Sequence, residues 1–266
     1  MKTILAGFAT LVATLVAAFA TRLAALTAVV AVALPTHAGE VQVAVAANFS
    51  APMRKIAAQF ERDTGHRANL SFGATGKFYA QILNGAPFEV LLAADDTTPA
   101  RLEQAGLVVK GSRFTYATGQ LVLWSKRAQF VDDQGAVLKS GKFDRIALAD
   151  PRLAPYGAAA IEVMTRLGLI QALESRFVLG ESISQAFQFV ATENAPLGFV
   201  ALSQVFADGK MTEGSAWRVP AELYSPIRQD AILLAKGKDK AAAISLMAYL
   251  QGDQAKAVMR AFGYDL

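Results

Sequence analysis

Cysteine is missing from this chain and histidine nearly so: its 266 residues include no Cys and two His. Without cysteine there are no disulfides, no thiolate metal ligands and no thiol nucleophile. His37 belongs to an expected leader segment, which leaves His66 as the one imidazole of the remaining chain. The sequence also has no G-x-S-x-G motif of the kind that marks many serine hydrolases. These absences favour binding over catalysis.

A strong charge of either sign is lacking as well. The chain has 26 Lys and Arg against 22 Asp and Glu, a net charge of +4. Lys2 and Arg22 lie in the leader, so the chain from Gly39 onward has 24 basic and 22 acidic residues and a net charge of +2. This balance, without a run of basic residues, predicts no nucleic-acid or membrane-binding surface.

The first 38 residues predict an export signal. They contain no acidic residue and two apolar runs, Thr3–Thr21 and Leu23–Leu34. They end in Thr36-His37-Ala38, whose small residues at positions −3 and −1 suit a signal peptidase. We therefore expect residues 1–38 to be a signal peptide cleaved between Ala38 and Gly39, and the protein to be exported. An uncleaved membrane anchor is the alternative, because the first run approaches the ~20 apolar residues of a membrane span.

Hydrophobic strands alternate with helical patterns along the rest of the chain, which predicts an α/β fold with mostly parallel sheets covered by helices. Strands are expected at residues 41–47, 69–72, 88–94, 119–125, 145–149, 176–179, 197–201 and 230–235. Two such series, with chain crossings near residues 119 and 230, predict two lobes. Lobe I would comprise residues 39–118 plus 228–266, and lobe II residues 119–227. A ligand would lie in the cleft between them, and hinge closure would enclose it.

Four of the expected strands end at a small polar turn, just where a helix starts. These turns are Asn48-Phe49-Ser50, Gly73-Ala74-Thr75-Gly76-Lys77, Asp150 to Gly157, and Gly180-Glu181-Ser182-Ile183. A helix start presents backbone N–H groups without partners and about half a positive charge. Several such starts around one gap would hold a small anion without Lys or Arg.

The same turns carry a resemblance to the periplasmic molybdate-binding proteins, the substrate-binding components of molybdate ABC importers. The similar segments occur in the same order over nearly the whole chain after residue 38: Ala46–Ser50, Ser71–Ile82, Asp150-Pro151 to Pro155-Tyr156-Gly157, Asn194–Val200 and Phe262-Gly263-Tyr264. The resemblance implies a two-lobed periplasmic-binding-protein type II fold with two hinge crossings. It also implies a monomer that binds molybdate, and tungstate too, and delivers it to the membrane permease of an ABC importer. It implies no cofactor and no enzymatic activity.

The resemblance also implies the ligand-binding residues. It places Asn48, where other members have Ser, and Thr75, where Ser is usual, as side-chain donors. The backbone N–H groups of Gly76, Tyr156 and Ile183 would complete the site. Molybdenum would be held as its oxyanion, without direct protein–metal bonds. A Tyr that some members use after the strand at 197–201 is replaced here by Ala201, and Asn48 is the candidate to compensate.

Each of these positions also has a purely structural interpretation. Asn48 suits a helix N-cap, Thr75-Gly76 suits a turn, and Ile183 suits a core. Asp95-Asp96 has the look of a catalytic carboxylate pair, but before Thr97-Thr98-Pro99 it favours a helix cap.

Other functions remain open on the same fold. The ligand of a binding protein with this sequence could be another small oxyanion such as sulfate. A receptor for an organic acid or amine would call for Arg or Asp at the turns. An enzyme or sensor is a further alternative.

Overall fold

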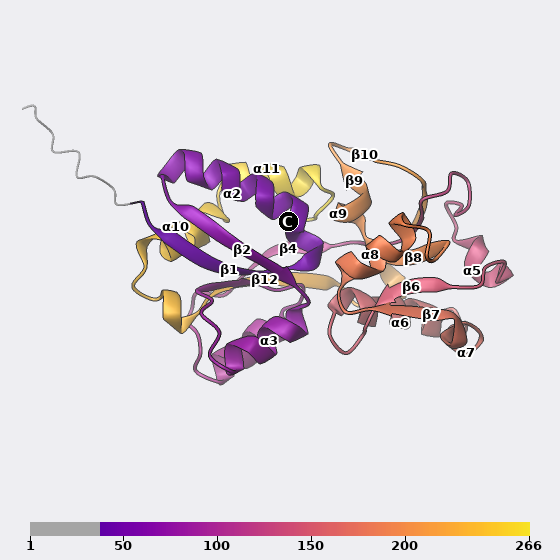
Figure 1. Cartoon of the computed structure of the whole chain (residues 1–266), viewed down its shortest axis with the longest axis horizontal. Helices are drawn as coiled ribbons and strands as arrows, with labels where there is room; N and C mark the ends of the chain where they lie inside the picture. Colours follow the sequence, from indigo (N-terminus) through magenta and orange to yellow (C-terminus); the bar gives the residue numbers. More distant parts are fainter. Residues whose placement is uncertain (1–37) are drawn as a thin grey trace, which may run out of the picture. The chain divides into compact units, whose positions relative to one another are not determined.

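The first of two five-stranded sheets combines strands from the N-terminal half of the described chain with one strand from its C-terminal part. A computed structural model describes residues 38–266 (Figure 1), so the predicted signal peptide lies outside the described residues except for Ala38. The strand order is β2-β1-β3-β12-β4, and β12 runs antiparallel to both of its neighbours. The strands are β1 (Glu40–Ala46), β2 (Arg67–Gly73), β3 (Val90–Leu92), β4 (Phe114–Gly119) and β12 (Ile227–Leu233).

Helices cover both faces of this sheet because its strands are apolar on both sides. One face packs against α2 (Ser50–Thr64), α10 (Ala241–Tyr249) and α11 (Asp253–Ala261), through a core that includes Val43, Phe49 and Ile56. The other face packs against α3 (Thr75–Leu83) and α4 (Thr97–Gln104). Figure 1 shows α2 and α11 on the side of the sheet opposite α3.

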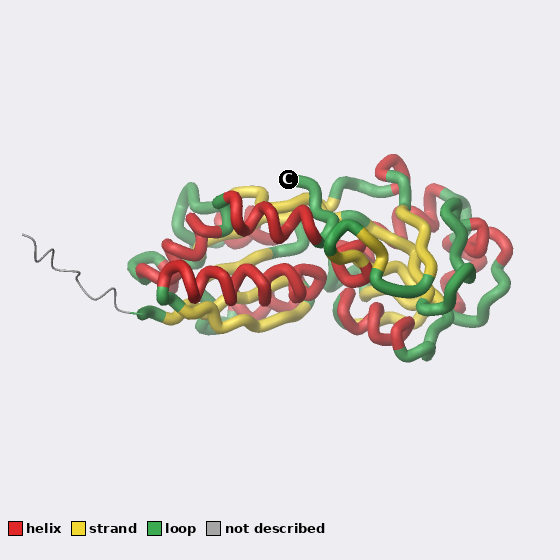
Figure 2. Tube along the Cα trace, turned by 90° about the horizontal axis from the view of Figure 1, so that it is seen from above, coloured by secondary structure: helices red, strands yellow, loops and turns green. Residues whose placement is uncertain are grey.

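The second sheet has the order β11-β5-β8-β6-β7. Its strands are β5 (Leu121–Ser125), β6 (Ile146–Ala149), β7 (Phe177–Gly180), β8 (Leu197–Ala201) and β11 (Ser215–Arg218). Helices α5 (Ala136–Ser140) and α6 (Pro155–Arg166) pack on one face, and α8 (Ile183–Ala191) and α9 (Leu202–Val205) on the other. In Figure 2 the helices, in red, lie along both groups of strands.

The remaining elements are short. They are η1 (Ala47–Phe49), α7 (Ile170–Leu173), η2 (Glu174–Arg176), the β9–β10 pair (Phe206–Ala207 and Lys210–Met211), η3 (Ala221–Leu223) and η4 (Ala235–Gly237). Within residues 38–266, no helix has the length and apolar character needed to cross a membrane.

The chain changes sheets at two places. Gln120 alone separates β4 of the first sheet from β5 of the second, and residues 219–226 lead back from β11 to β12. The register of β12 against β4 shifts between Gln229 and Asp230, which marks a bulge next to the returning crossing. A cleft lies between the two sheets. It is lined by residues from both of them and by residues 225–228 at the end of the returning crossing.

The structure confirms the predicted α/β fold with two sheets flanked by helices. Each sheet is mixed, with two parallel and two antiparallel strand pairs, whereas mostly parallel sheets were predicted. Strand β8 has its predicted bounds, and α2 ends at Thr64 before Gly65, whose φ of 73° is left-handed. The predicted strand at 119–125 is wrong at its start. Gly119 ends β4, a strand that the pattern did not predict, and β5 starts at Leu121. β4 was missed because it is held by pairing with β12, more than a hundred residues later in the chain.

Candidate functional site

Four helix starts surround one small cavity. Its volume is about 10 Å³. The residues that line it are Ala46, Ala47, Asn48, Gly73, Ala74, Thr75, Ala94, Ala154, Pro155, Tyr156 and Ile183. They come from the β1–η1, β2–α3, β6–α6 and β7–α8 junctions, together with the end of the β3 segment. In the described part of the chain, no charged residue lines the cavity.

Thr75 presents a donor at the β2–α3 junction. It is the first residue of α3 and is 2% exposed. Its Oγ1 accepts a hydrogen bond from the backbone N–H of Ala94 at 2.9 Å. Because the oxygen is the acceptor in that bond, the hydroxyl hydrogen is left to donate elsewhere. Thr75 thus combines a fixed side chain with a free donor.

Asn48 has its amide group held by other side chains. It lies in η1 and is 2% exposed. Its Nδ2 donates to Oε1 of Gln229 and to the hydroxyl of Tyr264, each at 2.9 Å. The backbone carbonyl of Asn48 accepts from the Ser203 hydroxyl at 2.8 Å. Both hydrogens of the Asn48 amide are therefore engaged within the protein, whereas the resemblance implies that this group donates to a ligand.

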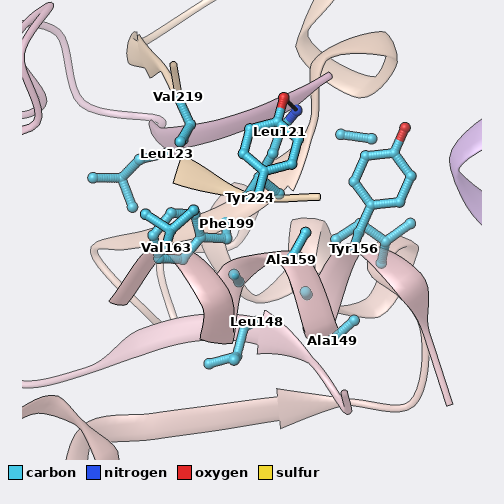
Figure 3. Close-up of a cluster of buried hydrophobic side chains, with 14 of the residues drawn as sticks. Leu121, Leu123, Leu148, Ala149, Tyr156, Ala159, Val163, Phe199, Val219 and Tyr224 are labelled. Carbon is cyan, nitrogen blue, oxygen red and sulfur yellow. Dashed lines mark hydrogen bonds between the residues drawn. The ribbon is translucent and has the colours of Figure 1, made fainter. Parts of the chain in front are cut away.

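Tyr156 follows Pro155 in the first turn of α6. Its ring is 1% exposed and belongs to the core of the second sheet, near Ala159 (Figure 3). Its hydroxyl accepts from Nε2 of Gln229 at 3.1 Å. The ring is thus interior. The backbone N–H of Tyr156 lies in the helical turn whose N–H groups have no intrahelical acceptor.

Ile183 starts α8, and its side chain is 3% exposed in the same core as Tyr156. The preceding Ser182 caps the helix by accepting from the backbone N–H of Gln185. As in α6, the N–H at the start of the helix has no acceptor one turn earlier. The Ile183 side chain is therefore part of the core, as its apolar character suggested, and its backbone lies at the cavity.

Gly76 is placed differently from its neighbours. Its N–H donates to the carbonyl of Leu153 at 3.0 Å, across the cleft between the two sheets. Gly76 lines a larger adjoining pocket of about 400 Å³. Asp95 and Arg152 lie in that pocket as well. In this arrangement the Gly76 N–H holds the two sides of the cleft together and does not point to the small cavity.

Four residues that were not predicted to belong to the site connect it. Gln229, Tyr116, Tyr264 and Ser203 are buried and join Asn48 and Tyr156 in one hydrogen-bond network. Tyr264 was visible only as the end of the resemblance. Nothing in the local pattern marked Gln229, which lies just before the predicted strand at 230–235. Ala201, which stands where some members of the resembled family have Tyr, is buried at the end of β8, two residues before Ser203.

The network is neutral. Burial raises the pKa of the hydroxyls of Tyr116 and Tyr156 well above the ordinary value of 10. Burial also raises the pKa of Tyr264 to about 12, against hydrogen bonds from neighbouring groups that lower it. All three hydroxyls therefore keep their protons at physiological pH and retain their ability to donate.

Charged side chains lie around the cleft and not in the cavity. Lys77 Nζ, on α3, lies 2.5 Å from Glu181 Oε2, which precedes α8. This ion pair joins the two sides of the cleft. Asp95 Oδ1 accepts from the backbone N–H of Thr98 at 2.7 Å in the first turn of α4, which is the capping role favoured for it over a catalytic pair.

Comparisons with known proteins identify the family of the chain. Residues 41–265 match the family model described as bacterial extracellular solute-binding protein. The chain is 62% identical to the molybdate-binding protein ModA of Azotobacter vinelandii over 220 residues, which cover 83% of this chain and 87% of that protein. It is 52% identical to the ModA of Rhodobacter capsulatus over 218 residues, 82% and 85% of the two chains.

A solved structure is similar over the same region. The Azotobacter vinelandii periplasmic molybdate-binding protein superposes with a TM-score of 0.82 at 42% sequence identity. The match covers 85% of this chain and 99% of that one.

Proposed function

The chain belongs to the bacterial extracellular solute-binding protein family, among its molybdate-binding members, and we propose that the cavity between its two sheets captures molybdate for an ABC importer. The observation that carries the proposal is the convergence of four helix starts on a cavity whose lining has no charged side chain in the described residues. The helix starts supply N–H donors and partial positive charge. Capture and delivery require no catalytic group.

The chemistry of the donors selects the ligand class. Molybdate and tungstate are fully deprotonated dianions at neutral pH, so every ligand oxygen accepts hydrogen bonds. Phosphate keeps a proton and needs an acceptor, and a cage of donors would leave that proton unpaired at a cost of about 1–3 kcal/mol. Hydrogen bonds to an ionised group are roughly twice as strong as neutral ones. Tungstate has the same charge and shape as molybdate, and we propose that it binds as well.

Thr75, Tyr156 and Ile183 are the donors that we assign first. Thr75 offers its hydroxyl hydrogen, and Tyr156 and Ile183 offer the N–H groups of their helix starts. Asn48 and Gly76 complete the proposed set. Both are engaged within the protein in the present arrangement, by Gln229 and Leu153 respectively, so each must exchange its protein partner for the ligand.

The small cavity implies that the site opens to admit its ligand. A volume of about 10 Å³ matches the space that a single water molecule needs. A tetrahedral oxyanion is larger than one water. We propose that the two lobes, residues 39–118 plus 228–266 and residues 119–227, separate at the crossings to admit it and close around it.

Export and partner follow from the same proposal. We propose that residues 1–38 are removed before Gly39 in the periplasm, and that the protein acts there as a monomer. Its partner would be the membrane permease of an ABC importer. N-terminal sequencing of the exported protein would show Gly39 as the first residue, whereas a start at Met1 in the membrane fraction would show a retained anchor.

Calorimetric titration of dialysed protein tests the ligand. We expect molybdate and tungstate to bind and to raise the melting temperature by mass action. Phosphate should do neither. Sulfate is also a dianion, so discrimination against it would have to come from the size of the ligand-bound cavity, and we expect it to bind more weakly. Binding of sulfate in preference to molybdate would reassign the cargo, and equal binding of phosphate would overturn the all-donor site.

Asn48→Ala is the accompanying variant. If Asn48 donates to the ligand, its loss should weaken molybdate binding by about 1.5–3 kcal/mol, the range for hydrogen bonds to charged groups. The measurement belongs well below the melting temperature of the variant, because Asn48 also supports the network of Gln229 and Tyr264. Binding equal to that of the parent would remove Asn48 from the proposed site.

A further inference from the structure

Gln229 lies at the junction of the two sheets, and its amide group is hydrogen-bonded at both ends. The side chain is fully buried. Its Oε1 lies 2.9 Å from Nδ2 of Asn48 and 2.9 Å from the hydroxyl of Tyr116. Its Nε2 donates to the hydroxyl of Tyr156 at 3.1 Å. Gln229 thus connects two residues that line the cavity from opposite sides of the cleft.

The backbone around this amide is shaped to hold it. The bulge between Gln229 and Asp230 interrupts the regular register of β12, and bulges commonly direct a side chain toward a site. Gly119, at the end of β4, leaves space for the contact. A Cβ at this position would lie 2.0 Å from the Tyr156 hydroxyl and 2.4 Å from Gln229 Nε2. The Gln229–Tyr156 bond therefore requires glycine at position 119.

A second arrangement of hydrogen bonds satisfies the same groups. If the amides of Asn48 and Gln229 both turn over, Gln229 Nε2 donates to Oδ1 of Asn48, and Gln229 Oε1 accepts from the Tyr156 hydroxyl. The two ends of an amide have nearly the same shape, so the exchange needs little space. The Tyr116 hydroxyl then donates to the carbonyl of Ala93, which already lies at 3.0 Å.

The two arrangements differ in what they leave for a ligand. In the first, Asn48 Nδ2 donates both of its hydrogens, one to Gln229 and one to Tyr264. In the second, Asn48 Oδ1 accepts from Gln229 and from the Tyr264 hydroxyl, and Nδ2 is released. The Tyr264 hydrogen then leaves Ser203 Oγ and the Asn48 carbonyl, which still accepts from the Ser203 hydroxyl. Only the second presents a donor from the Asn48 side chain, and an oxyanion accepts hydrogen bonds and cannot donate them.

We propose that Gln229 is a positioning residue for oxyanion binding, whose amide turns over together with that of Asn48 so that Nδ2 of Asn48 becomes available to the ligand. This inference rests on the proposed function, and specifically on Asn48 as a ligand donor. The neighbouring tyrosines stay protonated, because burial raises the pKa of each. They can therefore donate in either arrangement.

Gln229→Glu separates the two arrangements. A carboxylate accepts from Asn48 Nδ2 but has no hydrogen to give to Oδ1, so it holds Asn48 in the first arrangement. We expect molybdate affinity to fall by roughly tenfold to a hundredfold at neutral pH, from the lost ligand bond and the added negative charge. Affinity should recover on mild acidification, since a protonated carboxyl group carries an O–H donor.

The pH profile needs matched controls. In Gln229→Met the new side chain has similar length but cannot donate a hydrogen bond. This variant should bind molybdate more weakly than the parent at every pH, with no recovery in mild acid. Gln251→Glu places the same charge on the surface, near the end of α10, and should bind like the parent. Among the groups around position 229, Asp230 is paired with Arg113 at 3.2 Å, Asp95 is already present in the parent, and the three tyrosines remain neutral.

The outcomes distinguish this inference from the proposed function. If the parent does not bind molybdate, the proposed function fails. If the parent binds and Asn48→Ala weakens binding, but Gln229→Glu and Gln229→Met lose affinity equally at every pH, Gln229 is merely structural and the inference is wrong. If Gln229→Glu does not fold, ¹⁵N NMR of the parent decides. Molybdate should shift the side-chain amide signals of Asn48 and Gln229 together, and a shift of Asn48 alone would overturn coupled turning.

Discussion

At the scale of single residues, Thr75 offers a clear test of a side-chain donor. Its hydroxyl accepts from Ala94 and has its hydrogen free. Thr75→Val keeps the shape and removes the hydroxyl, so molybdate binding should weaken by about 1.5–3 kcal/mol. The variant should also lose about 1–3 kcal/mol of stability, because the Ala94 N–H is left buried without an acceptor.

Thr75→Ser is the matched control for this change. It keeps the hydroxyl and removes one methyl group. Serine is also the usual residue at this turn in the family that the chain resembles. Calorimetry should show affinity close to that of the parent. If Thr75→Val binds as tightly as Thr75→Ser, the hydroxyl is no ligand and Thr75 serves only the turn.

Tyr156 tests a backbone donor. Tyr156→Phe preserves the N–H at the start of α6, so molybdate affinity should change little. The variant should nevertheless lose about 1–3 kcal/mol of stability, because the buried Gln229 Nε2 loses its acceptor. Thermal unfolding and titration measure the two effects separately. A large loss of affinity with unchanged stability would make the hydroxyl the ligand group and would contradict the backbone assignment.

At the scale of elements, the Asp95 carboxyl caps α4, and its protonation makes the stability of the fold depend on pH. Burial raises the pKa of its carboxyl above 3.8, and hydrogen bonds from Thr98 oppose the rise. A raised pKa means that the folded state favours the neutral form. This contribution to stability is fully present below pH 3.8 and is lost as pH rises through the raised pKa.

Asp95→Asn should therefore melt at a higher temperature than the parent at neutral pH, since the amide keeps an acceptor for the Thr98 N–H without the buried charge. The difference should shrink in mild acid as the parent carboxyl is protonated. Asp95→Ala should be less stable than Asp95→Asn by about 1 kcal/mol, because it loses the cap. A melting difference between Asp95→Asn and the parent that does not change with pH would contradict this assignment.

At the scale of the whole molecule, closure of the cleft is the main prediction. The Lys77–Glu181 ion pair and the Gly76–Leu153 hydrogen bond join its two sides. The pair Lys77→Cys and Glu181→Cys can carry spin labels without interference, because the chain has no cysteine. We expect molybdate to shorten and narrow the distance distribution between the labels, and phosphate to leave it unchanged.

A label pair at Lys55→Cys and Arg260→Cys is the control, since both positions belong to helices of the first sheet and should not respond. Trp124 is less suitable as a reporter of closure. It lies inside the second sheet, fully buried and stacked on Phe187. If molybdate leaves the Lys77–Glu181 distribution unchanged while it binds, the site does not close by lobe motion.

The sequence by itself determined the elements and the positions of the helix starts. Hydrophobic periodicity, turn residues and capping are read from neighbours within a few positions, so they predict the turns. The resemblance then implied Asn48, Thr75, Tyr156 and Ile183 as the ligand-binding residues within those turns. The local signals placed the helix starts at the ends of strands, and the parallel arrangement brings the ends of such strands to one edge. The expectation of an anion-binding site thus came from local patterns.

The tertiary structure alone decided which partners those residues have. Asn48 meets Gln229, 181 residues away, and Tyr264, 216 residues away. A glutamine beside a strand has no local signal that distinguishes it from a surface residue, and a terminal tyrosine has none for the core. Their roles follow from the pairing of β12 with β4, which carries the chain back between the lobes. Strand pairing across such separations depends on the packing of the whole chain, and periodicity within a few residues does not record it.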